Sequence, residues 1–325
     1  MATSGTVDQT RIDVVSVIDH AFRRCGKLAA TVSGELVQSA KENLFLILTD
    51  LSNRGLSLFC VEKYVLGTES GKLVYALPSG LTDVLNVNYR TADLLQGTPL
   101  AQGIDLATAQ TVSTVGLRFA ADAELTLAYE TSSDNLSWVT RYSVPVTTSA
   151  DAWVYQDVER APAARYWRVR TVSGVQPALS TLEFRNNPRE LTMSSLNRDD
   201  YVAQPNKSAL SSRALEYWFD KQVAPQLWVW PGTNNASDQI VVWAQHYIQD
   251  VGALSNELAL PSRWLESVIL TLACRCALEI PATELPPNRL EFLTGLASEH
   301  LTRAEAGESD GSPIRLQPNI RGYTR

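Results

Sequence analysis

The sequence predicts an α+β fold, with helices at both ends of the chain and a long β-rich middle. Apolar residues recur at helical spacing in residues 10–55 and again in residues 257–308. Between them lie short runs rich in Val, Tyr, Thr and Leu, separated by turn compositions such as GTESG. With 325 residues the chain exceeds what one hydrophobic core usually supports, so more than one structural unit is expected.

The N-terminal part, residues 1–92, is predicted to contain a helical hairpin followed by the first half of a β domain. TRIDVVSVIDHAFRRCG and ELVQSAKENLFLILTDLSNRG each carry an apolar face at helical spacing, and each ends at a glycine, Gly26 and Gly55. The runs LSLFCVEKYVL, KLVYALP and TDVLNVNYR then favour strands of an antiparallel meander.

A new unit is expected near residue 93, where the composition shifts toward Thr, Ser, Ala and Val and where Gly97, Pro99 and Gly103 follow. Residues 93–187 contain strand-like runs at the spacing of a β-sandwich and no helical pattern. Residues 188–256 return to β-type segments, from YVAQPNKSAL to DQIVVWAQHYIQDV, and are predicted to complete the β domain.

Residues 257–308 predict two further helices, in LPSRWLESVILTLACRCALEI and PPNRLEFLTGLASEHLTRAEAGE. Because every apolar stripe must be covered, the N- and C-terminal helices are expected to form one bundle. Residues 309–325 have two prolines and no periodic face, which predicts an extended basic arm. The arm either frays or inserts into a neighbour through Ile314, Arg315, Leu316, Ile320, Arg321 and Tyr323.

The composition argues against several functions. A net charge of −7 disfavours a general nucleic-acid binder, which needs an excess of Lys and Arg. The four cysteines lack zinc-site spacing and are expected to be reduced thiols, and the three histidines stand apart from any known nucleophile motif. We therefore expect no catalytic residue, no metal, no cofactor and no enzymatic activity. The N-terminus lacks the pattern of a secretory signal, and no run is long enough to span a membrane, so a soluble, intracellularly made protein is expected.

Aromatic residues gather in EYWFDKQVAPQLWVWPG. Trp228 and Trp230 are predicted to share one face of a strand, because side chains alternate along it. A position in the core and a position in a subunit interface both remain open, since Trp is favoured in each.

In the order of its segments the chain resembles the head-to-tail connector, or tail adaptor, proteins of short-tailed bacteriophages (tail tubular protein A-like). The resemblance lies in the opening helices, the Tyr75-x-Leu77-Pro78 strand end followed by DVLNV, the segment EYWFDKQVAPQLWVWPG, and LPSRW before a late helix. It implies a structural virion protein in the tail below the portal vertex, made in the host cytoplasm. The implied assembly is a dodecameric ring, a homo-oligomer that binds the portal protein and a tail tube or nozzle protein or tail fibres. Viral DNA would pass through it without specific binding, and no membrane is involved.

The intervening residues 93–187 depart from that family. SSDNLSWVTRYS and ARYWRVR are similar to discoidin or galactose-binding-like domains, which implies a jelly-roll-like sandwich. The glycine customary in this turn is Asn135, which tolerates the left-handed conformation. Trp138 and Trp167 are assigned to the core. Trp153 and Tyr155, on one strand face, are expected to be freer to be exposed and are candidates for contact with a ligand or tail protein.

The sandwich also supports an alternative function, a carbohydrate-binding or host-attachment protein that acts through this domain. A glycan or cell-wall hydrolase is a third hypothesis, for which the sequence offers only acid pairs such as Asp199 and Asp200.

Overall fold

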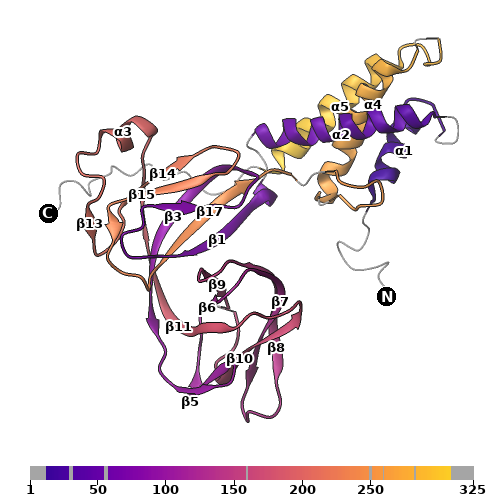
Figure 1. Cartoon of the computed structure of the whole chain (residues 1–325). Helices are drawn as coiled ribbons and strands as arrows, with labels where there is room; N and C mark the ends of the chain where they lie inside the picture. Colours follow the sequence, from indigo (N-terminus) through magenta and orange to yellow (C-terminus); the bar gives the residue numbers. More distant parts are fainter. Residues whose placement is uncertain are drawn as a thin grey trace. The chain divides into compact units, whose positions relative to one another are not determined.

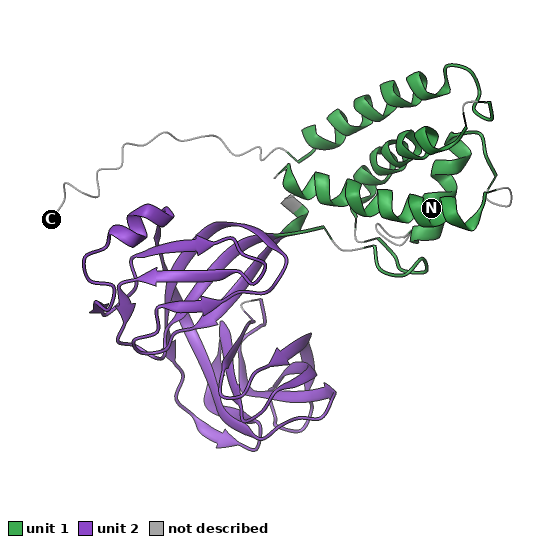
Figure 2. Cartoon of the chain, turned by 45° about the horizontal axis from the view of Figure 1, so that its top comes forward, with its two compact units in different colours: residues 1–60, 246–325 green, residues 61–245 purple. Residues whose placement is uncertain are grey.

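The computed structural model describes residues 12–28, 32–54, 58–158, 160–248, 251–258, 260–281 and 283–308, and confirms the α+β class with a β-sandwich domain (Figure 1). The chain divides into two compact units, coloured separately in Figure 2. Residues 1–60 and 246–325 form a helical unit, and residues 61–245 form a β unit.

The helical unit contains the four helices that the periodicity predicts: α1 (Val14–Arg24), α2 (Gly34–Asn53), α4 (Ser262–Glu279) and α5 (Arg289–Ala306). Asp13 begins α1, because its carboxylate accepts the backbone N–H of Ser16 at 2.9 Å. Ser33 begins α2 in the same way. Helices from both ends of the sequence share one core, which includes Phe22, Leu44, Leu48, Trp264, Leu270 and Leu272.

The β unit is organised by a six-stranded sheet. Its strands, in spatial order, are β1 (Val61–Gly67), β17 (Gln239–His246), β3 (Leu81–Leu94), β11 (Leu179–Thr192), β6 (Thr114–Phe119) and β9 (Trp153–Asp157). The two edge strands come together, since Lys63 of β1 forms an ion pair with Asp157 of β9. The sheet therefore curls back on itself.

A second sheet completes the sandwich. Its strands, in spatial order, are β4 (Thr98–Leu100), β5 (Gly103–Gln110), β10 (Ala164–Ser173), β7 (Ala123–Ser132) and β8 (Val139–Thr148). The core between the sheets includes Leu117, Phe119, Leu127, Tyr129, Trp167 and Phe184, so the core position predicted for Trp167 is confirmed. Residues 93 and 187 lie inside β3 and β11, and these long strands continue from the β domain into the sandwich, although their pairing shifts register between Asn186 and Arg189.

The remaining strands form two small sheets beside the part of the six-stranded sheet that contains β17 and β3. One contains β12 (Ser194–Ser195), β14 (Glu216–Asp220), β15 (Gln226–Trp230) and β2 (Val74–Ala76), and the other pairs β13 (Leu210–Ser211) with β16 (Gly232–Thr233). They cover a core that includes Tyr75, Leu81, Tyr217, Leu227, Val229 and Ile240.

Two local predictions of strand were wrong. YVAQPNKSAL was expected to be β-type, but its first residues belong to the helix α3 (Arg198–Ala203). Asn197 caps this helix by accepting the N–H of Asp200 at 2.8 Å, and acidic residues occupy its first turn. The run LSLFC was expected to open a strand, but Leu58–Cys60 forms a 3₁₀ turn before β1.

Candidate functional site

The predicted arm lies outside the described residues, and so do its six candidate contact residues, Ile314, Arg315, Leu316, Ile320, Arg321 and Tyr323. Their role stays a prediction. The structure does describe the residue from which the arm departs. Glu308 is buried, and its carboxylate accepts hydrogen bonds from Nε of Arg263 and Nε1 of Trp264, both at 2.8 Å. The start of α4 therefore anchors the chain as far as residue 308.

The exposure predicted for Trp153 and Tyr155 was wrong for Tyr155, which is only 8 % exposed. The two rings do share a strand face, and they stack with centroids 5.4 Å apart. A Cβ added at Gly67 of β1 would lie 2.7 Å from Cβ of Trp153, and one at Gly116 of β6 would lie 2.6 Å from the Tyr155 ring. The pair is covered because the curled sheet places two glycines against it. Ligand contact by this pair stays a prediction.

The Ser132–Trp138 turn has the predicted backbone but a different aromatic placement. Asn135 adopts φ +60°, as expected for the residue in the customary glycine position. Asp134 holds the turn by accepting the N–H groups of Leu136 and Ser137 at 2.9 and 2.8 Å. The core position predicted for Trp138 was wrong: its side chain is only half-buried, and the guanidinium carbon of Arg168 lies 4.0 Å from its ring centroid.

Arg168 belongs to a cluster on the outer face of the second sheet. Trp167 and Val169 point into the sandwich core, so Arg168 and Arg170 of β10 point away from it. Both donate to Glu130 of β7: Nε of Arg168 to Oε2 at 2.7 Å, and Nε and Nη2 of Arg170 to Oε1 at 3.0 and 2.9 Å. Burial alone would raise the pKa of Glu130, but the two arginines outweigh it and the pKa is lowered.

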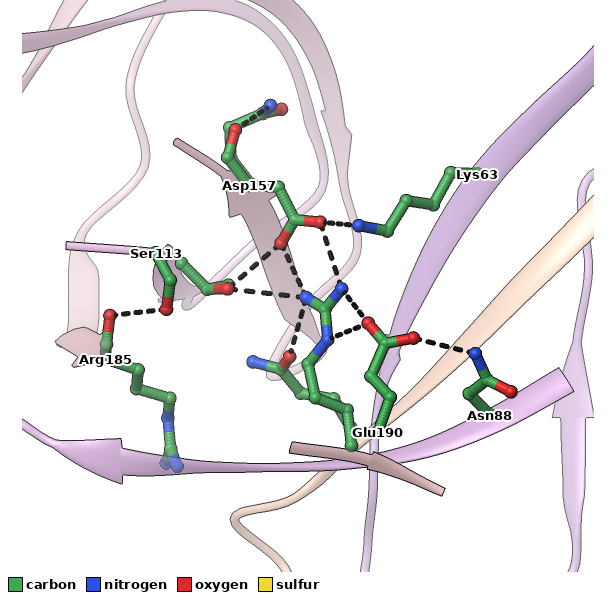
Figure 3. A network of polar contacts seen from close by, with 10 residues as sticks. Lys63, Asn88, Ser113, Asp157, Arg185 and Glu190 are labelled. Atoms are coloured by element: carbon green, nitrogen blue, oxygen red, sulfur yellow. Dashed lines mark hydrogen bonds and ion pairs between the residues drawn. The ribbon is translucent and has the colours of Figure 1, made fainter. Parts of the chain in front are cut away.

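The second polar cluster lies where the β domain meets the sandwich, with Arg90 buried at its centre and Glu190 on its solvent side (Figure 3). Arg90 of β3 is fully buried and donates from Nη1 to Oδ1 of Asp157 at 2.7 Å and from Nε to Oε1 of Glu190 at 2.8 Å. Lys63 reaches Asp157 from β1, and Asn88 donates to Glu190 at 2.7 Å. Two cations and two carboxylates thus meet from four strands.

The electrostatics of this cluster favour the charged state of its carboxylates. Burial would raise the pKa of Asp157, but its hydrogen bonds and charge interactions with Arg90 and Lys63 prevail, and the pKa lies below its usual value. The pKa of Glu190 is lowered in the same way, with burial again opposing Arg90 and Asn88. A charge-balanced cluster whose members bind one another is suited to holding strands together. We therefore assign it a structural role.

The aromatic segment around Trp228 lies over α3. Leu227 and Val229 enter the core, and Trp228 and Trp230 occupy the opposite face, as the alternation predicts. Trp228 packs against Trp218 and Tyr201, with ring centroids 5.7 and 5.6 Å apart. Trp228 therefore lies half-buried in an aromatic cluster on the face of β15 away from the core, and α3 covers part of this face.

The helical unit exposes two apolar faces. On α2, Phe45 and Leu46 are 47 % and 52 % exposed and border a groove of about 510 Å³ that Lys41 also lines. On α5, Phe292 is 59 % exposed and borders a groove of about 410 Å³ with Glu291. A Cβ at Gly295 would meet no atom within 4 Å, so this groove contains an open notch.

Features of other site classes are absent from the part of the chain that the structure describes. Its His, Cys, Asp and Glu residues include no group of three or more that could hold a metal ion. Cys25, Cys60, Cys274 and Cys276 form no disulfide bond, and burial, the main cause, raises the pKa of Cys25 to about 11. None of the described helices has the length and apolar composition needed to cross a membrane.

Neither polar cluster was predicted from the sequence. Arg90 lies in a strand whose apolar and polar side chains alternate, so its position in the sequence predicts exposure to solvent. Its ion-pair partners come from β9 and β11, which are distant in the sequence. The outer cluster did leave a signal, because alternate arginines in ARYWRVR place two cations on one strand face, opposite Trp167 and Val169.

Comparison with known proteins finds no matching family model and no matching curated protein. Among solved structures, the chain is similar to the CBM32 module of AlyQ in complex with 4,5-unsaturated mannuronic acid. The identity is 16 %, with 37 % of this chain and 97 % of that module covered and a TM-score of 0.23. A truncated AlyQ with CBM32 and alginate lyase domains gives the same identity and TM-score, with 38 % of this chain and 34 % of that chain covered.

Chitosan-binding module 1 of a Paenibacillus sp. IK-5 chitosanase/glucanase shares 19 % identity, covers 40 % of this chain and 97 % of its own, and has a TM-score of 0.21. These neighbours are carbohydrate-binding modules. At such TM-scores they assign no ligand to this chain.

Proposed function

We propose that this chain is a non-enzymatic subunit of a head-to-tail adaptor ring in the virion tail of a short-tailed bacteriophage. The ring docks on the portal protein and links it to a tail tube or nozzle protein, so that viral DNA passes through without specific binding. The order of the sequence segments that resemble this family supports the proposal, and the acidic composition is compatible with a channel that does not retain DNA.

The observation that carries the proposal is the pair of apolar faces on the helical unit. This unit already has a complete core, yet α2 exposes Phe45 and Leu46, and α5 exposes Phe292. Neighbouring exposed apolar side chains beside a groove are typical of protein–protein contacts. An assembly subunit needs such faces.

The two faces also fit each other. Lys41 and Glu42 border the α2 groove, and Glu291 and Glu299 border the α5 groove. Glu42 accepts a hydrogen bond from Gln38 and Glu299 pairs with Arg303, whereas Lys41 and Glu291 have no ion-pair partner among the described residues. Phe45 or Leu46 of one copy can fill the notch beside Gly295 of the next, with Lys41 opposite Glu291. A contact between two different faces is heterologous and generates a ring when the rotation closes.

Charge reversal tests this contact. Mass photometry of the full chain, with and without the portal protein, should show portal-dependent rings. Lys41→Glu and Glu291→Lys should each reduce the ring population, and the double variant should restore it, because the pair is re-formed with exchanged signs. Lys207→Glu, an exposed reversal in the β unit, is the control and should leave assembly unchanged. The proposal fails if neither a ring nor a portal complex forms with the unaltered chain.

A second candidate function is carbohydrate binding or host attachment through the sandwich. The observation in its favour is the half-buried Trp138 stacked on Arg168, since an aromatic face beside polar donors is a common way to hold a sugar ring. A glycan array probed with the full chain tests it. Binding to glycans without any ring or portal complex would favour this function over the first.

A further inference from the structure

The outer face of the second sheet carries more positive charge than its structural role requires. We define the arginine face as Glu130, Trp138, Arg168 and Arg170. Glu130 is 3 % exposed, so its carboxylate must be neutralised, and one bidentate arginine would suffice. Two arginines are present, and one positive charge remains uncompensated within the cluster.

The donors of these arginines are only partly used. Contacts with Glu130 engage Nε and Nη2 of Arg168 and of Arg170. Each Nη1 has no hydrogen-bond partner among the described residues. The side chains of Arg168 and Arg170 are 34 % and 48 % exposed, so these remaining donors can meet a ligand from solvent.

The face is also held in place before any ligand arrives. Glu130 fixes both guanidinium groups from below, and Thr140 donates to the same carboxylate at 3.1 Å. Trp138 stacks on Arg168, and the Asp134-capped turn positions Trp138. Fixed side chains lose little conformational entropy on binding, which favours affinity.

We propose that the arginine face binds an anionic sugar, with Arg170 and Arg168 contacting its carboxylate or sulfate group and Trp138 lining the sugar ring. The ring of the neighbouring Tyr166 is covered by the guanidinium of Arg165, 4.8 Å from its centroid, and is left out of the site. Guanidinium groups recognise planar oxyanions, and aromatic side chains present apolar faces that suit a pyranose ring. The site is distinct from Trp153 and Tyr155, which lie on the other sheet. The inference rests on the second candidate function and narrows it to a ligand class.

Galacturonic acid oligomers provide a direct probe, because the methyl-esterified oligomer has the same rings without the negative charge. Isothermal titration of the full chain should detect binding of trigalacturonate that weakens with salt, and much weaker binding of its methyl ester. Arg170→Gln should raise the dissociation constant about tenfold, since it removes charge-assisted hydrogen bonds while Arg168 still neutralises Glu130. Arg303→Gln, an exposed arginine of the helical unit, should change nothing.

Each alternative outcome is decisive. Two results would overturn the anionic site and leave general carbohydrate binding in place. One is an equal affinity of the chain for trigalacturonate and its methyl ester. The other is an equal affinity of Arg170→Gln and the unaltered chain for trigalacturonate. No binding of any glycan on an array would remove the second candidate function as well. Binding of single-stranded DNA with the same dependence on Arg170 would identify a nonspecific polyanion surface and would also overturn the inference. Thermal unfolding of Arg170→Gln serves to verify its fold.

Discussion

Arg90 donates from Nη1 to Oδ1 of Asp157 at 2.7 Å, and this bond joins strands β3 and β9. The two residues lie 67 positions apart in the sequence. Neither residue belongs to a recognisable motif. The bond nevertheless closes the curled sheet on its inner side, together with Glu190 and Lys63.

Arg90→Met should destabilise the β unit strongly. The substitution leaves Asp157 and Glu190 close together with Lys63 as their remaining cation. Removing one partner of a buried ion pair costs about 3–5 kcal/mol of unfolding free energy. Urea unfolding of the full chain measures this loss. Arg189→Met is the matched control, because Arg189 and Asp93 form an exposed pair worth less than about 1 kcal/mol. Similar losses for both variants would contradict the structural role of the cluster.

The same cluster predicts a loss of stability in acid. The pKa values of Asp157 and Glu190 are lower in the folded chain than their ordinary values of about 4, so their contribution is present above about pH 5 and is lost as the pH falls through the folded pKa values. The Asp157→Asn, Glu190→Gln double variant should therefore show a flatter decline of unfolding free energy between about pH 5 and pH 3. Parallel pH profiles for the variant and the unaltered chain would count against this account.

Two buried tyrosines should respond oppositely to loss of the hydroxyl. The Tyr155 hydroxyl is buried without a hydrogen-bond partner among the described residues, so Tyr155→Phe should be neutral or stabilising by up to about 1 kcal/mol. The Tyr89 hydroxyl contacts Asp238 at 2.7 Å and Thr233 at 2.9 Å, so Tyr89→Phe should cost about 1–3 kcal/mol. Thermal unfolding compares them directly. A loss for Tyr155→Phe as large as that for Tyr89→Phe would indicate a partner for the Tyr155 hydroxyl.

The effect of deleting the C-terminal arm on stability should depend on the residue at which the deletion begins. Truncation before Ser312 retains Glu308 and should leave the melting temperature unchanged, while weakening binding to the portal protein if the arm contacts it. Truncation before Glu308 also removes the acceptor of Trp264 and Arg263 and should destabilise the helical unit by about 1–3 kcal/mol. Unchanged portal affinity of the shorter deletion would exclude the arm from that contact.

The long helices could be predicted because their apolar stripes are local signals. α1 and α4 needed only the spacing of residues within each helix. The short α3 also carried a local signal, since Asn197 precedes two acidic residues that favour a helix N-terminus, and the strand prediction overlooked it.

The candidate sites depended on contacts between distant segments, and those could not be predicted. Tyr155 is buried because Gly67 and Gly116 leave room against β9, which requires β1 and β9 to meet. Trp138 follows a correctly predicted turn, yet its position outside the core is set by Arg168, thirty residues further along the chain. Sequence spacing alone contains neither relationship.

The continuity of β3 and β11 has a mechanical consequence. These strands pair from Asn88 with Thr192 to Leu94 with Arg185, across the limits predicted from composition, with one shift of register between Asn186 and Arg189. A domain joined by two flexible linkers could change its orientation, and the linkers would transmit little of a force applied to it. Here a force applied to the sandwich is transmitted through the paired strands β3 and β11 to the β domain. A molecule bound to the sandwich would therefore apply its force to the six-stranded sheet.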